Sequence, residues 1–302
     1  MKPPVSYFTT ISEAQSEGPG PLASPRHLLD YVTEHWEDNF VTLDLKTKEL
    51  VELFVKRPFF LLASVDAPLY QRYQRSITLG LENSLEWFVI ENDRIVFGPD
   101  ARLMQESVDE QAPTIALRSF RNLVNVHVAN NFDSIPALYS HLDDINLLNP
   151  GRLRPDWDTY FMTLASLASH RSNCMKRRVG AVLVREKRIV STGYNGTPRW
   201  LKNCNEGGCR ICNGTLPTDG ERECICLHAE ENAISEAGRE RVGIGAVLYC
   251  NTCPCERCTI KIIQSGVKEV VYNLEYKVDQ HSAALFKEAG VILRKHALPA
   301  EI

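Results

Sequence analysis

Two stretches in the second half of this 302-residue chain decide its fold: "LHAEENAI" at Leu227–Ile234 and "YCNTCPCERC" at Tyr249–Cys258. The first predicts the beginning of a helix that ends at Gly238, because glycine is common just past the end of a helix. The second carries a strand, "AVLYCN", into another helix, "CERCTIKIIQSG", which ends at Gly266 by the same rule. A helix, a strand and a second helix in succession indicate a sheet that is covered by helices.

Three side chains from these stretches predict a metal site. Cys255 and Cys258 are three residues apart at the start of a helix, so they lie on one face of it. The helix dipole lowers the pKa of thiols at that position and prepares them to bind a metal. His228, at the start of the preceding helix, supplies a nitrogen ligand. One histidine and two cysteines leave a fourth zinc position open, which is typical of a catalytic site rather than a structural one.

Glu230 adds a proton carrier to this predicted site. It follows His228 by two residues, near enough to reach a water on the metal without binding the metal itself. A carboxylate there can accept the proton of that water and deliver it elsewhere. The pattern H-x-E…P-C-x-x-C is typical of zinc-dependent deaminases. The other interpretations are a zinc ribbon, which needs a fourth ligand, and an inactive relative, which should have lost Glu230.

The rest of the second half alternates between helices and strands. Helical spacing is expected over Asp158–Arg171, and a hairpin over "VGAVLV" and "RIVSTGYNG". After the two quoted stretches come "VKEVVYN" as a strand, "DQHSAALFKEAG" as a helix and "VILRKH" as the last strand. This order predicts a largely parallel central sheet with helices on both faces.

Proline and glycine divide the chain into three parts. "SEGPGPLASP" at Ser16–Pro25 sets off a mobile N-terminal tail, residues 1–24. "NLLNPGRLRPDW" at Asn146–Trp157 separates residues 25–150 from residues 151–302.

Residues 25–150 are expected to form an α/β domain. "RHLLDYVTEHW" predicts a helix with Leu28, Leu29 and Val32 on one face, and the apolar run Phe59–Val65 predicts a buried strand that a helix follows. This part resembles a nucleotide-kinase-like domain. The chain contains no GxxxxGK[ST] loop, so the phosphate cradle of such enzymes is missing. We therefore expect a degenerate, non-catalytic domain with a scaffold, oligomerisation or regulatory role.

The charge distribution and the hydropathy argue against a polynucleotide-binding protein and against a membrane protein. Residues 1–150 contain 12 basic and 21 acidic side chains, whereas residues 151–302 contain 22 and 17. The second half can attract a small phosphorylated ligand but is not basic enough for a long nucleic-acid track. No apolar run reaches the length of a membrane span, and the N-terminus lacks a secretory signal. We expect a soluble protein of the cytoplasm, with the nucleus as an alternative compartment.

The second half resembles the deoxycytidylate (dCMP) deaminase family. The resemblance rests on "RSNCMKRRVGAV", "TGYNGTP", "CLHAEENAI", "CPCERC" and "IIQSGVKEVVYNLEY", within about Asp156–Lys295. It implies a mixed five-stranded sheet sandwiched by helices, and an α/β extension ahead of it that resembles the fungal form. The implied reaction is hydrolysis of dCMP to dUMP and ammonia, which supplies dUMP for thymidylate synthesis. The "GYNGTP" loop separates this family from relatives that act on tRNA adenosine, guanine or riboflavin precursors.

The resemblance also implies roles for individual residues. His228, Cys255 and Cys258 bind catalytic zinc, and Glu230 protonates N3 of cytosine and then the leaving ammonia, while activated water attacks C4. Asn195 holds the sugar hydroxyl, Ala229 lies in the substrate site, and the aromatic Tyr276 lies along the nucleotide. A packing role is the alternative for Tyr276. The candidates for the 5′-phosphate, or equally for an effector triphosphate, are Arg171, Lys176, Arg177, Arg178 and Gly196.

All ten cysteines lie between Cys174 and Cys258, which in a reducing compartment indicates metal binding. Many family members carry a second, structural zinc, and the resemblance places Cys174 and Cys204 in it. We expect Cys209 and Cys224 to complete the set, with Cys212 as an alternate because "CRIC" has zinc-knuckle spacing. Cys226 is a weaker candidate, and Cys250 and Cys253 are expected to be merely buried.

Partners and regulation follow from the resemblance alone. It implies a homo-oligomer, with a hexamer favoured, that dCTP activates and dTTP inhibits, with Mg²⁺ accompanying the effector. The loop Gly193–Pro198 is expected to form part of the effector site. Two rival functions are a polynucleotide cytosine or adenosine deaminase and a non-catalytic, zinc-stabilised binding module. The sequence pI of about 6.1 argues against the first, and the presence of Glu230 against the second.

Overall fold

The computed structural model describes residues 5–8, 24–43, 45, 47–81, 84–98, 116–214, 224–275 and 280–298. The chain forms two compact units, one running to Arg154 and the other spanning Pro155–Glu301. None of the helices within the described ranges has the length and apolarity needed to cross a membrane.

The second unit is built on a five-stranded mixed sheet with the order β6-β5-β7-β8-β9. Its strands are β5 (Gly180–Arg185), β6 (Arg188–Tyr194), β7 (Val247–Thr252), β8 (Glu269–Leu274) and β9 (Ile292–Lys295). Strand β5 is antiparallel to both β6 and β7, whereas β7, β8 and β9 run parallel. The structure therefore confirms the predicted hairpin and the mixed sheet. The parallel part is smaller than the strand order alone suggested, because the hairpin reverses one side of the sheet.

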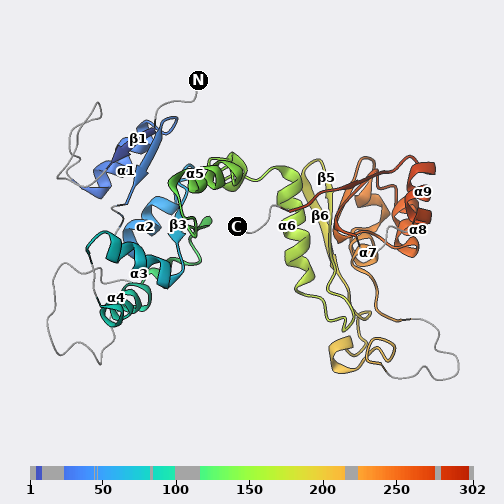
Figure 1. Ribbon diagram of the computed structural model, residues 1–302. Helices are drawn as coiled ribbons and strands as arrows, with labels where there is room; N and C mark the ends of the chain where they lie inside the picture. The colour runs from blue at the N-terminus through green and yellow to red at the C-terminus, as the bar shows by residue number, and fades with distance from the viewer. Residues whose placement is uncertain are drawn as a thin grey trace. The chain divides into compact units, whose positions relative to one another are not determined.

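Helices cover both faces of this sheet, as Figure 1 shows. Helix α6 (Trp157–Ser169) packs on one face, where Phe161, Met162 and Ala165 meet alternate residues of β5. Helices α7 (Ala229–Val242), α8 (Glu256–Ser265) and α9 (Gln280–Glu288) cover the other face. The alternation along a strand explains both cores: Ala181 and Leu183 point to the larger core, and Val182 and Val184 to the smaller one. The predicted helix–sheet–helix sandwich is confirmed.

One predicted helix boundary differs in detail. Gly238 has a left-handed φ of 69° and interrupts α7, as its sequence position predicted. The chain then makes a further helical turn and leaves the helix only at Gly243. Helix α8 ends as predicted, because Gly266 adopts the left-handed conformation at its C-terminus.

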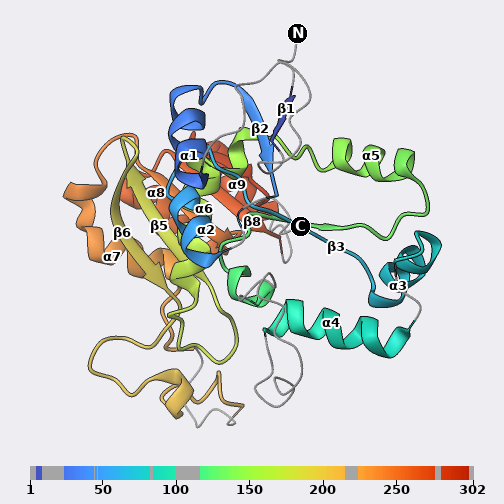
Figure 2. The same cartoon turned by 90° about the vertical axis from the view of Figure 1, so that its left-hand side faces the viewer.

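The first unit combines helices with two pairs of parallel strands. Helices α1 (Pro25–Glu34) and α2 (Lys48–Val55) form a small core, in which Leu28, Leu29 and Val32 are buried as predicted. Strand β2 (Asn39–Thr42) pairs with β1 (Val5–Phe8), and β3 (Ala63–Asp66) with β4 (Val126–Ala129). Helices α3 (Leu69–Thr78) and α4 (Leu85–Phe97) lie side by side in both views (Figures 1 and 2). Helix α5 (Ile135–Asp144) follows β4.

Two expectations for the first unit differ from what the structure contains. The tail predicted over residues 1–24 includes strand β1, and most of its other residues lie outside the described ranges. The buried strand predicted over Phe59–Val65 is shorter and less buried than expected. Phe59 and Phe60 pack against the small core, and only β3 remains extended, with three of its four residues exposed. An α/β composition is present, and the kinase-like character of this unit stays a prediction.

A charged cluster joins helix α6 to the sheet. Asp158 accepts hydrogen bonds from Nη1 and Nη2 of Arg294 at 2.7 and 2.8 Å, and one from the hydroxyl of Tyr249 at 2.8 Å. Arg294 also pairs with Glu269 of β8. The hydrogen bonds from Arg294 hold the pKa of Asp158 below its usual value, although burial opposes the change. Helix, inner strand and edge strand are thereby connected through one carboxylate.

Replacing Asp158 with asparagine is expected to destabilise the second unit by about 2 kcal/mol, because charge-assisted hydrogen bonds contribute about 1.5–3 kcal/mol and this one is partly exposed. The midpoint of its calorimetric transition should fall by about 4–8 °C. The lowered pKa means that the stabilisation is present above the unfolded-state pKa, about 3.9, and is lost as the pH falls below it. Glu240→Gln, at an exposed position on α7, is the control. An equal midpoint for Asp158→Asn and the control at pH 7 would contradict this role.

Candidate metal centre and active site

The starts of two helices bring three metal-binding side chains together. His228 is the residue before the first turn of α7, and Cys255 the residue before the first turn of α8. The Nδ1 atom of His228 lies 3.5 Å from Sγ of Cys255 and 3.3 Å from Sγ of Cys258. The three ligand atoms all lie within 4.8 Å of one another. A spacing of roughly 3–4 Å is what ligands on one tetrahedral zinc require, given bonds of about 2.0–2.3 Å.

The electrostatics of these groups suit a cation. A hydrogen bond from the thiol of Cys258, together with His228, lowers the pKa of Cys255 to about 4. The hydrogen bond with Cys255 in turn raises the pKa of His228. Both shifts show that the site favours a thiolate at Cys255 balanced by positive charge beside it. One imidazole nitrogen and two sulfurs are a donor set that zinc prefers, so the residues present fit that ion.

Glu230 lies in the same pocket and is 4% exposed. Burial raises its pKa to about 7, although His228 opposes the change. It does not belong to the three-ligand cluster. A buried carboxyl group that titrates near neutrality can both accept and donate a proton in this pocket.

Glu231 fixes the start of helix α7, a role that our sequence analysis missed. Its side chain accepts a hydrogen bond from the backbone N–H of His228 at 2.9 Å and pairs with Lys261 and Arg257 of α8. Burial alone would raise the pKa of Glu231, but these three partners outweigh it and lower the pKa. The spacing His228-x-x-Glu231 is that of a capping box, and this spacing could have revealed the role of Glu231 from the sequence.

Strand β6 meets the start of α7 at very close range. A Cβ atom at Gly193 would lie 2.0 Å from the carbonyl oxygen of Ala229, so only glycine fits there. The next contact is made by Asn195, which is 4% exposed. Its Oδ1 accepts a hydrogen bond from the N–H of Ala229 at 2.8 Å, and its Nδ2 donates to the carbonyl of Arg177 at 3.4 Å. Gly196 then forms two backbone hydrogen bonds with Leu227, the residue before His228.

The pocket around these groups has a cavity volume of about 310 Å³. Of the predicted phosphate candidates, Lys176 and Arg177 line it together with His228 and Glu230. Arg171 and Arg178 are exposed and do not line it. Asn195 lines the pocket, whereas the fully buried Ala229 does not. Tyr276 lies outside the described residues.

Thr252 and Cys253 also line the pocket; the sequence analysis missed Thr252 and expected Cys253 to be merely buried. They stand at the C-terminal end of β7, where α/β sheets commonly place their ligands, and this position was the signal that could have identified them. Cys250 is fully buried in the core, as expected, but Cys253 is half-buried and faces the pocket.

The six cysteines upstream of His228 gather into one cluster. Two overlapping groups of four have their sulfur atoms within 4.8 Å of one another. The first group is Cys174, Cys204, Cys212 and Cys226, and the second is Cys209, Cys212, Cys224 and Cys226. The expected set is divided between them: Cys174 and Cys204 belong to the first group, and Cys209 and Cys224 to the second. The weaker candidates, Cys212 and Cys226, belong to both.

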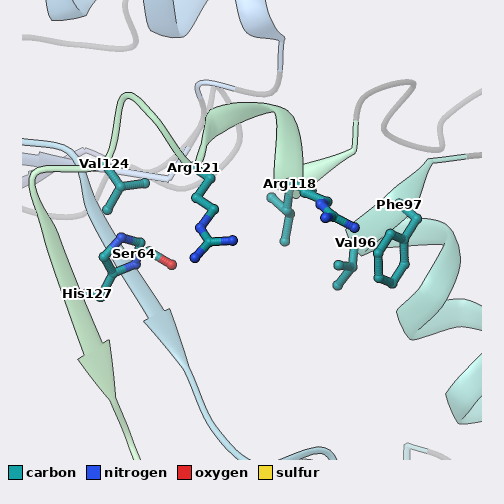
Figure 3. Close-up of a pocket in the computed structure, with 8 residues that line it drawn as sticks. Ser64, Val96, Phe97, Arg118, Arg121, Val124 and His127 are labelled. Atoms are coloured by element: carbon teal, nitrogen blue, oxygen red, sulfur yellow. The ribbon is translucent and has the colours of Figure 1, made fainter. Parts of the chain in front are cut away.

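A separate cavity of about 290 Å³ lies in the first unit (Figure 3). Ser64 and His127 are paired across β3 and β4, and the side chains of Arg121 and His127 reach toward the same space. Arg118 lies 5.4 Å from the ring centre of Phe97 at the other side. The described residues that line this cavity include no carboxylate, so its charge suits an anion. Its described lining residues form no metal-ligand group like the one in the second unit.

Comparison with known proteins assigns the family. The family model described as "Cytidine and deoxycytidylate deaminase zinc-binding region" matches residues 155–274. The deoxycytidylate deaminase of Schizosaccharomyces pombe is 46% identical over 281 residues, which cover 92% of this chain and 83% of that protein. The Saccharomyces cerevisiae deoxycytidylate deaminase is 43% identical over 93% of this chain and 88% of its own length. A cyanophage S-TIM5 dCMP deaminase solved with dCMP and dUMP is 31% identical, and the match covers 47% of this chain and 98% of that one with a TM-score of 0.39. The chain therefore belongs to the zinc-binding deoxycytidylate deaminase family.

Proposed function

We propose that this protein catalyses the hydrolytic deamination of dCMP to dUMP and ammonia. The observation that carries the proposal is the convergence of His228, Cys255 and Cys258 in one pocket with the buried carboxyl group of Glu230. Membership of the deoxycytidylate deaminase family, which extends over both units of the chain, supports dCMP as the substrate.

His228, Cys255 and Cys258 would hold the catalytic zinc through one nitrogen and two sulfurs. When bound, zinc supplies the Lewis acidity that makes a water molecule nucleophilic at neutral pH. Glu231 keeps His228 in place by accepting the hydrogen bond of its backbone N–H and by pairing with α8, the helix that carries both cysteines.

Glu230 would carry the protons of the reaction. It accepts one proton from the attacking water and delivers it to N3 of the pyrimidine as a C–O bond forms at C4. It then moves the remaining hydroxyl proton to the exocyclic amine, the C4–N bond breaks, and ammonia leaves with the ring as uracil. A single carboxyl group can perform both transfers because burial raises its pKa toward neutrality.

Asn195 would position the substrate from beside the start of α7. One lone pair of its Oδ1 accepts the N–H of Ala229, and the other is available to a sugar hydroxyl. Lys176 and Arg177, which line the same pocket, would bind the 5′-phosphate. Arg171, Arg178 and the Gly196 loop would then serve an effector triphosphate, with dCTP activating, dTTP inhibiting and Mg²⁺ bound to the effector.

The remaining parts of the chain would support this reaction without entering it. The upstream cysteines would hold structural zinc, which contributes directly to folding free energy. The first unit would act in regulation or assembly of a homo-oligomer, and its cationic cavity suits an anionic ligand rather than deaminase chemistry.

The proposal is tested with the full-length protein by measuring ammonia release and dUMP formation from dCMP. Turnover should depend on zinc, disappear after treatment with a chelator and return when zinc is added. Single-stranded DNA and polyadenylate should give no product, because no long basic track accompanies the pocket. Deamination of the polynucleotide but not of dCMP would support the rival enzyme class. Zinc binding without any ammonia release would support a non-catalytic module.

A further inference from the structure

The upstream cluster contains six cysteine thiols, two more than one tetrahedral zinc ion can bind. Each of the two four-cysteine groups contains the same pair, Cys212 and Cys226, whose sulfurs lie 3.9 Å apart. We infer that this cluster is a binuclear zinc centre, in which Cys212 and Cys226 bridge two ions. Cys174 and Cys204 complete the first ion's ligands, and Cys209 and Cys224 complete those of the second. The inference rests on the structural zinc proposed above, and its metal count can be tested without the deaminase reaction.

The sulfur separations agree with two tetrahedra that share an edge. Zinc–sulfur bonds of about 2.3 Å in a tetrahedron place ligand sulfurs roughly 3.8 Å apart. The separation from Cys174 to Cys212 is 3.8 Å in the first group. In the second group Cys209 and Cys212 lie 3.5 and 3.1 Å from Cys224. A disulfide needs about 2.05 Å, so these pairs are not bonded to one another.

The order of the ligands along the chain supports the same assignment. Cys209 and Cys212 are separated by two residues, and Cys224 and Cys226 by one, so each close pair gives one terminal and one bridging ligand. Cys174 and Cys204 come from two separate segments and reach only the first ion. In Figure 1 the segment that carries Cys204, Cys209 and Cys212, drawn in gold, lies beyond the end of the hairpin rather than in the main core. The hydrophobic cluster around these residues consists of the six cysteines and Ile211, so metal ligation can supply the stability of the segment.

Neighbouring amides already point at the sulfurs. The backbone N–H of Met175 donates to Sγ of Cys204 at 3.4 Å. The side chain of Asn213 donates to the carbonyls of Cys204 and Cys209 at 2.8 and 2.7 Å and so connects a terminal ligand of each ion. Outer contacts of this kind orient ligands around a metal.

Net charge favours a centre with two zinc ions over a centre with one. A single zinc in either group would leave two thiols of the other group within van der Waals distance of a doubly negative tetrathiolate. Two zinc ions with six thiolates have the same net charge of −2 but leave no thiol without a metal. The centre with two zinc ions therefore binds all six sulfurs to metal without increasing the net negative charge.

The centre also bears on the active site. Cys174, Cys212, Cys224 and Cys226 line the same pocket as Glu230. Lys176 and Arg177 follow Cys174 by two and three residues and line that pocket too. Ligation of Cys174 would fix the backbone from which these two cations reach the pocket, so loss of the first ion should raise KM for dCMP more than it lowers kcat.

The decisive measurement is metal stoichiometry of the full-length protein combined with ¹¹³Cd NMR after metal exchange. We expect three ions per chain, one for each ligand group. Two cadmium signals should come from all-sulfur sites and show scalar coupling to each other through the bridging sulfurs. A third, uncoupled signal should come from the site with one nitrogen and two sulfurs. Two ions per chain, or a single all-sulfur signal without coupling, would overturn the binuclear centre.

Paired variants distinguish the single-ion alternatives. Cys174→Ser with Cys204→Ser should lower the count from three to two, and so should Cys209→Ser with Cys224→Ser. If only the second group held an ion, the first double variant would leave the count unchanged, and the reverse holds for the first group. Ile225→Ser, at an exposed position between Cys224 and Cys226, is the matched control and should retain three ions. If a variant does not fold, the NMR of the unaltered protein still decides the question. Loss of the uncoupled signal alone would count against the proposed catalytic site and not against this centre.

Discussion

The Glu230→Ala variant is expected to lose about 10²–10⁴-fold in kcat/KM on dCMP while it keeps its full zinc content. The loss follows because the three metal ligands are unchanged, whereas no other carboxylate lines the described part of the pocket to carry protons between water, N3 and the leaving amine. Glu230→Gln should lose as much, because the amide preserves the shape of the side chain but accepts no proton. Ammonia release and zinc analysis of the same preparations measure the two quantities.

Glu236 offers the matched control on the same helix. It is exposed and pairs at the surface with Arg199 at 2.9 Å, outside the pocket. Glu236→Ala should therefore have nearly the activity and zinc content of the unaltered protein. Activity of Glu230→Ala within tenfold of the control, or loss of its zinc, would falsify the proton-carrier role.

The second unit was predictable because its sequence pattern and its burial pattern agree. Short apolar runs predicted the strands, and glycines with left-handed φ angles lie where the two helices were predicted to end, at Gly238 and Gly266. The positions of His228 and Cys255 just before two helices followed from the same pattern. The approach of Gly193 to Ala229 could not be predicted, since it depends on how closely a strand and a helix pack.

The cysteine cluster shows where sequence reasoning reaches its limit. Spacing identifies Cys209 and Cys212 as a pair of ligands, but six thiols permit many sets of four. Which sulfurs meet depends on the path of an irregular segment that has neither a helical nor a strand period. The sequence analysis ranked Cys226 as a weaker candidate, yet it belongs to both four-cysteine groups. The strand predicted over Phe59–Val65 was drawn too long for a similar reason, because an apolar run does not reveal which of its residues pack as strand and which as loop.

A preference of at least about 10²-fold in kcat/KM for dCMP over deoxycytidine is expected from the charges in the pocket. Lys176 and Arg177 line it, and a hydrogen bond between a cation and a phosphate oxygen contributes about 1.5–3 kcal/mol. Two such bonds correspond to about 10²-fold or more, since 1.36 kcal/mol is a factor of ten. Rates on dCMP, CMP and deoxycytidine should be compared at equal concentration, both with and without dCTP and Mg²⁺, the activator proposed above.

The double variant Lys176→Met, Arg177→Met should abolish most of this preference by slowing dCMP, while deoxycytidine turnover stays within about threefold. That asymmetry separates a phosphate contact from a general loss of structure, which would slow both substrates alike. Lys268→Met is the matched control, because Lys268 precedes the first residue of β8 and therefore stands at the opposite edge of the sheet from Thr252 and the pocket. Equal rates on dCMP and deoxycytidine in the unaltered protein would show that Lys176 and Arg177 bind no phosphate in the catalytic complex. Their positive charge would then be assigned to the effector, and the enzyme to nucleoside rather than nucleotide substrates.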